Sequence, residues 1–323
     1  MKKILIISSN RLGDAILSSG LVDYFKEKQN PAEITFVCGE LPFQLFSKSE
    51  NIDHIIKLKK QKKSLHWLKL WSKIVLSLWD HVIDLRGTAI SFFLITKKRS
   101  IRPFIQGEKK THKVLAISNF FKEQIIKPSL KIKPLSAESL KKLEVFKNSN
   151  KKVLTFFIAP GANWAGKKWP KENFKELIKK LGKRFSPLKY RFVIIGSESE
   201  KFEGNYIKSF FKDNVIDLTG SLTLHEIFFF LKYCKLFIGN DSGLMHLSAA
   251  TGAPTVGLFG PSDIDQYHPW GENTLAIRTP ENPHQLMGDA NFSPKNKKSL
   301  MESLKVDKVE RDVVNFLNNL NKK

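Results

Sequence analysis

Cysteine is nearly absent from this sequence of 323 residues. Cys38 and Cys234 are the only two, they lie far apart, and neither belongs to a Cys-x-x-Cys pair. They therefore exclude a disulfide framework and a zinc ribbon. Long apolar runs are missing as well. The longest candidate, residues 65–79, contains Lys69 and Lys73, and it is shorter than the roughly 18–20 residues that cross a bilayer.

The apolar run near the start of the chain is too short to direct secretion. Ile4–Ile7 follows two lysines in the manner of a signal peptide, but the polar segment from Ser8 to Arg11 ends the run. The apolar core of a signal peptide takes about 7–15 residues. We therefore expect a cytoplasmic protein that does not span the membrane.

Arginine is scarce, although the chain is strongly basic. Of 54 basic residues only eight are arginine, and 31 acidic residues leave a net charge of +23. Proteins that recognise a nucleic-acid sequence depend on arginine for bidentate contacts with the bases, so we do not expect a nucleic-acid partner. The lysine excess, seen beside 25 phenylalanines, is also typical of an AT-rich coding sequence. A charge of this size nevertheless favours an anionic partner such as a phosphate, a membrane surface or an acidic glycan.

The length and the apolar pattern predict two α/β domains. A chain of this size typically forms two domains, and short apolar runs alternate with helical patterns in both halves, as in a parallel sheet covered by helices. We predict strands at residues 3–8, 33–38, 54–58, 81–85, 100–104, 153–159, 190–195, 236–238 and 255–258. We predict helices at residues 14–29, 171–185, 198–211, 223–234, 242–251 and 299–320. The lysine-rich segment 127–152 is predicted to be a linker that contains a short helix. Ligands are expected at the carboxyl ends of the strands.

The loop after the strand at 153–159 imitates a P-loop. Residues 161–167 spell G-x-x-x-x-G-K, but Lys168 stands where a P-loop needs Ser or Thr for Mg²⁺. Trp169-Pro170 follows at a point where a P-loop is already helical. We therefore predict a phosphate-binding loop of another kind, centred on Lys167. The alternative is that Lys167 is a solvated surface charge.

A second candidate follows the strand at 236–238. A turn with two glycines leads into a helix near Ser242, so that free backbone N–H groups and the positive end of the helix dipole suit a diphosphate. Gly243 allows a ligand to approach the backbone closely, and His246 lies one turn along from Ser242 on the same face. The alternative is that Asp241 or Ser242 only caps the helix and that His246 is a packed histidine.

Carboxylates mark two further turns. Asp14 follows the first strand in a turn without the G-x-G-x-x-G of a dinucleotide fold, so an NAD site is not expected there. Asp14 is a candidate general base, or a helix N-cap. Asp263 and Asp265 form a D-x-D pair of the type that binds metal in some sugar transferases, but such loosely spaced acids are common by chance, and we expect no metal site.

Three segments together resemble glycosyltransferase family nine, the ADP-heptose:lipopolysaccharide heptosyltransferases. They are RLGDAILSSG at 11–20, PGANWAGKKWP at 160–170 and GNDSGLMHLSAATGAPTVGLFGPSD at 239–263. The third is the most specific, because its D-[ST]-G-x-x-H core and its G-P-[ST]-D ending stand in register. The order and spacing of the segments fit over essentially the whole chain.

The resemblance implies a GT-B fold of two Rossmann-like domains facing across a cleft. Residues 1–150 would bind the acceptor and residues 151–323 the nucleotide sugar, with the helix at 299–320 returning toward the first domain. It also implies an inverting, metal-independent transfer of heptose from ADP-heptose to an anionic lipid A–core acceptor on the cytoplasmic face of the inner membrane, without a cofactor.

The resemblance assigns roles to individual residues. Asp14 would be the base for the acceptor hydroxyl. The donor would be held by Asn163, Lys167, Glu198, Asp241, Ser242, Gly243 and His246. Arg11 and Arg86 are candidates for the acidic acceptor, from their position and chemistry more than from a motif.

One departure and two alternatives remain open. Asn163-Trp164 stands where relatives often carry small hydroxyl or acidic residues, so the donor sugar and nucleotide are not fixed. The chain could instead use another nucleotide sugar, or be a sugar-nucleotide hydrolase or epimerase of the same fold.

A third alternative is a non-catalytic basic protein that binds a membrane surface or a nucleic acid. The lysine run 57–63 leads into Trp67, Trp71 and Trp79. We expect these tryptophans to pack on the core, and the lysines at 59, 60, 62 and 63 to contact an anionic bilayer peripherally.

Overall fold

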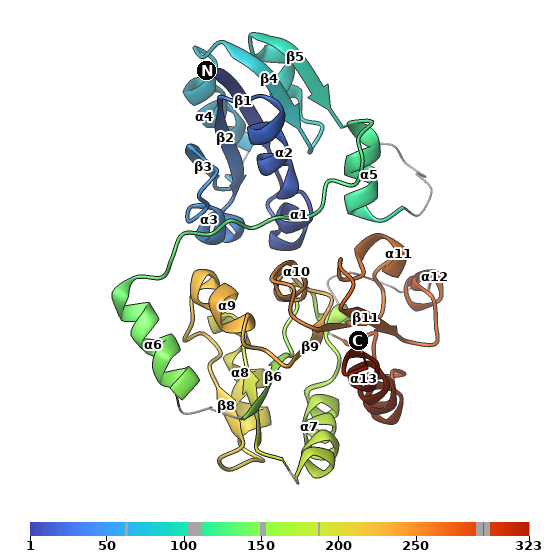
Figure 1. The fold of residues 1–323 in the computed structure, drawn as a ribbon. Helices are drawn as coiled ribbons and strands as arrows, with labels where there is room; N and C mark the ends of the chain where they lie inside the picture. The colour runs from blue at the N-terminus through green and yellow to red at the C-terminus, as the bar shows by residue number, and fades with distance from the viewer. Residues whose placement is uncertain are drawn as a thin grey trace. The chain divides into compact units, whose positions relative to one another are not determined.

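The structure of this protein is a computed structural model. It describes residues 1–61, 64–102, 111–148, 153–186, 188–288, 293 and 298–322. The described chain divides into two compact units, Met1–Pro134 and Leu135–Lys323 (Figure 1). Among the described residues, no helix combines the length and the apolar character needed to cross a membrane.

The first unit contains a parallel sheet in the order β3-β2-β1-β4-β5. Its strands are β1 (Lys2–Ile7), β2 (Ala32–Gly39), β3 (His54–Leu58), β4 (Trp79–Asp84) and β5 (Thr96–Ile101). Its helices are α1 (Leu12–Leu17), α2 (Gly20–Lys28), α3 (Glu40–Phe46), α4 (Leu65–Ile74), the 3₁₀ helix η2 (Ala89–Phe93) and α5 (Lys113–Phe120). The central strands read as continuous apolar runs because helices bury both of their faces.

The second unit contains a parallel sheet in the order β11-β10-β9-β6-β7-β8. Its strands are β6 (Leu154–Ala159), β7 (Tyr190–Ile194), β8 (Val215–Asp217), β9 (Leu236–Asn240), β10 (Thr255–Phe259) and β11 (Thr274–Arg278). Its helices are α6 (Ala137–Asn148), η3 (Ala165–Lys167), α7 (Lys171–Phe185), η4 (Glu198–Glu200), α8 (Lys201–Lys208), α9 (Leu224–Leu231), α10 (Gly243–Ala250), α11 (Ile264–Tyr267), α12 (Pro283–Met287) and α13 (Val306–Leu320). Both sheets confirm the predicted α/β class.

The helix predicted at 14–29 is wrong as a single element. It breaks at Ser18-Ser19 into α1 and α2, because a later segment of the chain crosses it there. A Cβ on Gly20 would collide with the Lys127 carbonyl oxygen, and Ser129 N donates to Ser19 Oγ at 2.9 Å. The backbone needs a glycine at this crossing.

Several other boundaries differ from the prediction as well. The helix expected at 198–211 begins as η4 and ends as α8 at Lys208. The strand expected at 100–104 is β5, which ends at Ile101, and residues 103 and 104 lie outside the described residues. The last helix begins at Val306 rather than at 299, because Ser299 and Leu300 bond to the loop before α7.

The chain divides inside the segment predicted as a linker, of which residues 149–152 lie outside the described residues. Residues up to Lys133 belong to the first unit, where Lys133 N donates to Lys48 O at 2.7 Å. Helix α6 belongs to the second, because Ser139 Oγ donates to buried Glu226 at 2.9 Å and Phe146 packs on Phe230. Helix α13 packs on α7 and β11. The predicted domain roles and the return of this helix toward the first domain stay predictions.

Candidate functional site

The candidate donor loop of the second unit, residues 160–169, is tied to the end of β9 by one buried amide. Asn240 is fully buried. Its Nδ2 donates to the Pro160 carbonyl oxygen at 2.7 Å, and its Oδ1 accepts from the Trp169 backbone N–H at 3.1 Å. Both ends of the loop are thus joined to the strand that leads into Asp241. The sequence signal, an amide at the end of a buried strand, was present but was not assigned a role.

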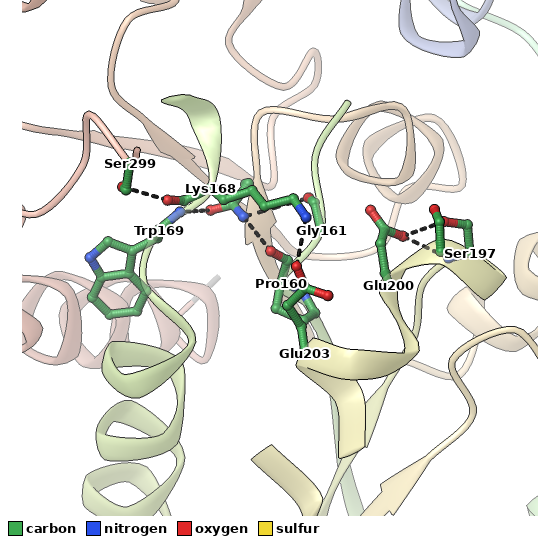
Figure 2. Close-up of polar contacts among 10 residues, drawn as sticks. Pro160, Gly161, Lys168, Trp169, Ser197, Glu200, Glu203 and Ser299 are labelled. Atoms are coloured by element: carbon green, nitrogen blue, oxygen red, sulfur yellow. Dashed lines mark hydrogen bonds and ion pairs between the residues drawn. The ribbon is translucent and has the colours of Figure 1, made fainter. Parts of the chain in front are cut away.

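The far end of the donor loop is anchored in the core. Trp169 is buried against Phe174, and its Nε1 donates to Leu304 O at 2.8 Å. Figure 2 shows the Ser299 hydroxyl meeting the Lys168 carbonyl oxygen, at 2.7 Å. Leu300 N donates to Gly166 O at 3.2 Å. The backbone around Lys167 is therefore held from both sides before any ligand binds.

Lys167 and Asp241 form an ion pair at the ends of β6 and β9. Lys167 Nζ lies 2.6 Å from Asp241 Oδ2, which also accepts from Ser262 Oγ at 2.5 Å. His246 Nε2 lies 3.9 Å from Asp241 Oδ1. The Lys167 side chain is 24% exposed and that of Asp241 only 7%. The carboxylate therefore orients a cation that an anionic ligand can still reach.

Helix α10 begins beside this ion pair. Ser242 occupies the N-cap position in extended conformation, but it does not act as a side-chain cap, and its buried Oγ finds no hydrogen-bond partner within the described part of the chain. Gly243 is the first helical residue, and His246 is buried one turn along. The free N–H groups and the helix dipole of α10 provide a site for negative charge next to Lys167.

Asn163 and Trp164 are placed differently from one another. Asn163 is exposed. The Trp164 ring lies over Gly166 so closely that a Cβ on this glycine would meet ring atoms at 2.7–2.9 Å. The departure from the family pattern at 163–164 is thus accommodated by a glycine two residues further on.

Glu198 contacts neither Lys167 nor Asp241 within the described part of the chain. Its side chain is 71% exposed and contacts Lys201 at 2.7 Å, and it also lies beside Gly220, which has a φ of +74°. Glu200, to which we gave no role from the sequence, is the acid that reaches Gly161. Its Oε2 accepts from Ser197 N at 2.6 Å, in a capping box of η4 (Figure 2). The Ser-x-x-Glu spacing was the signal for this cap.

Asp14 lies in the first turn of α1, after β1 in the first unit. The alternative that it caps this helix is wrong, because Arg11 occupies the N-cap position and Asp14 is the third helical residue. Its Oδ2 accepts from Ser9 Oγ at 3.3 Å, and Asp14 is partly exposed whereas Arg11 is exposed. The carboxylate is oriented by one hydroxyl and remains accessible.

Arg86 lies on the neighbouring strand end, after β4. Its Nη1 donates to Asn10 Oδ1 at 3.1 Å, and its guanidinium lies 4.8 Å from the centre of the Trp67 ring. Burial lowers the pKa of the Arg86 guanidinium. Buried Asp84 accepts from the backbone N–H groups of Arg86 and Thr88 at 2.9 and 2.8 Å, which fixes this turn. Arg86 is thus joined to the turn that carries Arg11 and Asp14.

The candidate residues are therefore divided between the two units, and the D-x-D pair has a structural role. The Asp263 side chain caps α11 by accepting from Asp265 N at 3.1 Å. Within the described ranges no group of three or more His, Cys, Asp or Glu residues is arranged to hold a metal ion.

Known proteins are similar to this chain over nearly its whole length. Residues 104–292 match the profile of glycosyltransferase family 9 (heptosyltransferase). The lipooligosaccharide heptosyltransferase 2 of Campylobacter jejuni is 28% identical over 98% of this chain and 99% of its own.

Solved structures share the fold. A family 9 glycosyl transferase from Veillonella parvula has a TM-score of 0.79 at 20% identity, covering 98% of this chain and 97% of its own. The ADP-heptose lipopolysaccharide heptosyltransferase II of E. coli has a TM-score of 0.73 at 19% identity, covering 99% of this chain and 100% of its own. The iron-containing dodecameric glycosyltransferase TibC of enterotoxigenic E. coli is more distant, at 0.57 and 14% identity over 98% of this chain and 76% of its own. These similarities confirm the predicted GT-B fold class.

Proposed function

Because the chain belongs to glycosyltransferase family 9, and is therefore an enzyme that transfers heptose, we propose that it transfers heptose from ADP-heptose to the inner core of lipopolysaccharide. The main observation in support of a donor-binding site is the ion pair of Lys167 with buried Asp241 beside the N-terminus of α10. This pair supports a binding site for a diphosphate. The named E. coli relative supports ADP-heptose as the donor.

The donor's diphosphate is bound by Lys167 and by the backbone N–H groups at the start of α10. Negative charge collects on this diphosphate as its bond to the sugar breaks, and a fixed cation and helix dipole stabilise that charge in the transition state. Asp241 and Ser262 hold the ammonium in place. The sugar and the phosphates of the donor are contacted by Asn163, Ser242, Gly243 and His246. Glu198 contacts the ribose.

The acceptor reacts through Asp14. The acceptor hydroxyl attacks the anomeric carbon, the bond from that carbon to the diphosphate oxygen breaks, and the hydroxyl proton passes to the Asp14 carboxylate. A single displacement of this kind inverts the anomeric centre. The carboxylate is supported in this role by its accessibility and by the Ser9 hydroxyl that orients it. The proposed reaction uses no metal.

The acceptor is an anionic lipid A–core, which Arg11 and Arg86 contact. Arg86 is suited to a phosphate or a carboxylate because Asn10 and the Trp67 ring already orient its planar guanidinium. We place the enzyme in the cytoplasm, in peripheral contact with the inner membrane of a Gram-negative cell, with no nucleic-acid partner.

Product analysis tests this function. The purified protein is incubated with ADP-heptose and, in parallel, with two delipidated lipopolysaccharide cores, one that ends before the heptoses and one that already carries a single heptose, and the products are separated by mass spectrometry. We expect ADP and a core enlarged by one heptose. Release of ADP with free heptose would identify the hydrolase alternative, and a changed sugar still attached to ADP would identify the epimerase alternative. Turnover of another nucleotide sugar in place of ADP-heptose would overturn the donor assignment.

A further inference from the structure

The donor loop contains a tryptophan whose ring folds over a glycine two residues further on. Trp164 is the extended residue that precedes the 3₁₀ helix η3. A Cβ on Gly166 would have three ring atoms of Trp164 as its nearest neighbours, at 2.7–2.9 Å. Real Cβ atoms do not approach other heavy atoms so closely. The ring therefore occupies the space that a side chain at position 166 would need.

Gly166 is suited to this position by its missing side chain and not by its backbone. Its φ lies outside the left-handed region that favours glycine. An alanine is therefore compatible with this φ, but its methyl group would collide with the Trp164 ring. Because the tryptophan and the glycine fit each other, we treat residues 164–167 as one unit and call them the ring–glycine turn.

The ring–glycine turn leads directly into the cation of the donor site. Lys167 N donates to the Trp164 carbonyl oxygen at 3.1 Å, which closes the turn. Gly166 is buried, with the Trp164 ring over it and Leu300 N bonded to its carbonyl oxygen at 3.2 Å. The residue that immediately precedes Lys167 is thus held by an aromatic side chain as well as by a hydrogen bond.

Without the ring, this glycine would be the loosest point of the donor loop. Glycine loses more conformational freedom on ordering than any other residue. Fixing the backbone of one residue changes an equilibrium constant by roughly tenfold. The Lys167 ammonium group lies 2.6 Å from Asp241 in the ordered turn, and a disordered Gly166 would let it leave this position.

We propose that Trp164 is a positioning residue for donor binding. Its ring holds Gly166 and thereby keeps Lys167 on Asp241, where the cation receives the donor's diphosphate. The ring acts through Lys167 and does not contact the donor itself. The inference rests on the proposed function, which assigns a diphosphate to Lys167. From the sequence, Trp164 was only a departure from the family pattern.

Titration calorimetry of the full-length protein with ADP tests the fit of ring and glycine. Trp164→Ala is expected to bind ADP roughly tenfold more weakly than the wild type. Gly166→Ala is expected to weaken binding as well, because its methyl group displaces the ring. In the Trp164→Ala protein, the same change at Gly166 meets no ring and removes the freedom of the glycine, so it is expected to restore part of the affinity. An opposite sign of one substitution in the two backgrounds is the signature of a joint role.

A second cycle of variants shows through which residue the ring acts. In the Lys167→Ala protein, Trp164→Ala is expected to cause no further loss of ADP affinity, because the cation that the ring positions is already absent. A ring that contacts the donor would instead cost affinity in both backgrounds.

Trp71→Ala is the matched control, since it removes a tryptophan from the other unit. Trp71 on α4 is 38% exposed. The prediction that three tryptophans pack on the core is thus wrong for Trp71, whereas it is confirmed for Trp79 and in part for Trp67. The control variant is expected to bind ADP as the wild type does. A cooperative thermal unfolding transition verifies that each variant folds.

Acylation of the lysines in the absence of ADP provides a readout that does not depend on the proposed donor. Peptide mass spectrometry compares the labelling rate of Lys167 with that of Lys168, which Glu203 holds at 2.6 Å. In Trp164→Ala, the labelling of Lys167 is expected to become several-fold faster, because its amine leaves Asp241 more often. The labelling of Lys168 is expected to stay the same.

Four results would overturn the inference. They are an undiminished ADP affinity of Trp164→Ala, losses of Trp164→Ala and Gly166→Ala that add in the double variant, a loss from Trp164→Ala that persists in the Lys167→Ala protein, and unchanged labelling of Lys167 in Trp164→Ala. Wild-type protein that binds no ADP, together with faster labelling of Lys167 in Trp164→Ala, would remove the proposed donor and leave the positioning role of Trp164 standing.

Discussion

Two adjacent lysines of the donor loop differ in what holds them. Lys167 Nζ pairs with Asp241 at the start of α10, whereas Lys168 Nζ pairs with Glu203 of α8, each at 2.6 Å. We expect Lys167→Ala to weaken ADP binding roughly 10–100-fold, because a charge-assisted hydrogen bond contributes about 1.5–3 kcal/mol. Isothermal titration with ADP measures the effect.

Lys168→Ala is the matched control for this prediction. It removes a lysine from the same loop but leaves the pair of Lys167 and Asp241 intact, so ADP binding is expected to stay near that of the wild type. Equal losses in the two variants would mean that the general positive charge of the loop, and not the ion pair with Asp241, determines donor affinity.

Asp14 allows the acceptor step to be separated from donor binding. The Asp14→Ala variant is expected to lose roughly 10²–10⁴-fold in turnover, the usual contribution of a general base. Its affinity for ADP is expected to be unchanged, because Asp14 lies in the first unit and the donor candidates lie in the second. Steady-state kinetics and titration of the same preparation provide both values, and retained turnover would remove Asp14 as the base.

Between elements, Asn240 links β9 to both ends of the donor loop. Asn240→Ala leaves the Trp169 N–H and the Pro160 carbonyl without their buried partner, and each orphaned group costs about 1–3 kcal/mol. We expect a lower free energy of unfolding in urea together with weaker ADP binding. Asn163→Ala, at an exposed position of the same loop, is expected to leave the free energy of unfolding unchanged. Equal stabilities of the two variants would argue against the linking role of Asn240.

At the junction of β4 and β5, His81 makes stability depend on pH. Its ring is buried, its Nε2 contacts Ser100 Oγ at 2.8 Å, and it packs edge-on against Phe25. Burial, with a smaller contribution from Lys98, lowers the pKa of His81 from 6.5 to about 4. Between these two pH values the unfolded chain binds a proton at His81 and the folded chain does not. The free energy of unfolding is therefore unaffected by His81 above pH 6.5, and it decreases by up to about 3 kcal/mol as the pH falls from 6.5 toward 4.

Urea unfolding at pH 7 and pH 4.5 measures this loss. Because carboxylates also titrate in this range, the wild type is compared with His81→Gln, which cannot take up the proton. We expect the difference in stability between the two proteins to shrink or reverse at the lower pH. A difference that does not change with pH would show that His81 is protonated in the folded state as readily as in the unfolded state.

The elements that the sequence predicted are those that local composition determines. Continuous apolar runs identified the central strands, and Pro170 with an amphipathic pattern marked α7. Strand β8 is only three residues long and β11 is half-buried, so neither shows a strong pattern. The break between α1 and α2 depends on the crossing of residue 127, which no local signal reports.

The candidate site was predictable in its parts but not in its pairing. Lys167 and Asp241 were both chosen from motifs, yet their 2.6 Å contact joins residues 74 positions apart. Glu200, rather than Glu198, approaches Gly161 because the turn at Ser197 directs it there. Such contacts follow from the order of the strands in the sheet, which places β6 beside β9.

On the scale of the whole molecule, each unit has a core of its own. The second unit's core runs from β6 to α13, and the first unit's core includes Leu5, Val82 and Leu70. Two cores permit two unfolding transitions instead of one. We expect calorimetry to resolve them, and we expect ADP at about 100 times its dissociation constant to stabilise the second unit alone, by about 2.7 kcal/mol.

The variants decide which transition belongs to which unit. Lys167→Ala is expected to reduce the ADP-induced shift, and Asp14→Ala to leave it unchanged, because ADP is expected to contact only the second unit. Leu5→Ala, which removes buried apolar volume from the first unit, is expected to lower only the transition that ADP does not move. A single transition that ADP and Leu5→Ala shift in opposite directions would mean that the units unfold together, and donor binding in one unit would then stabilise the acceptor residues in the other.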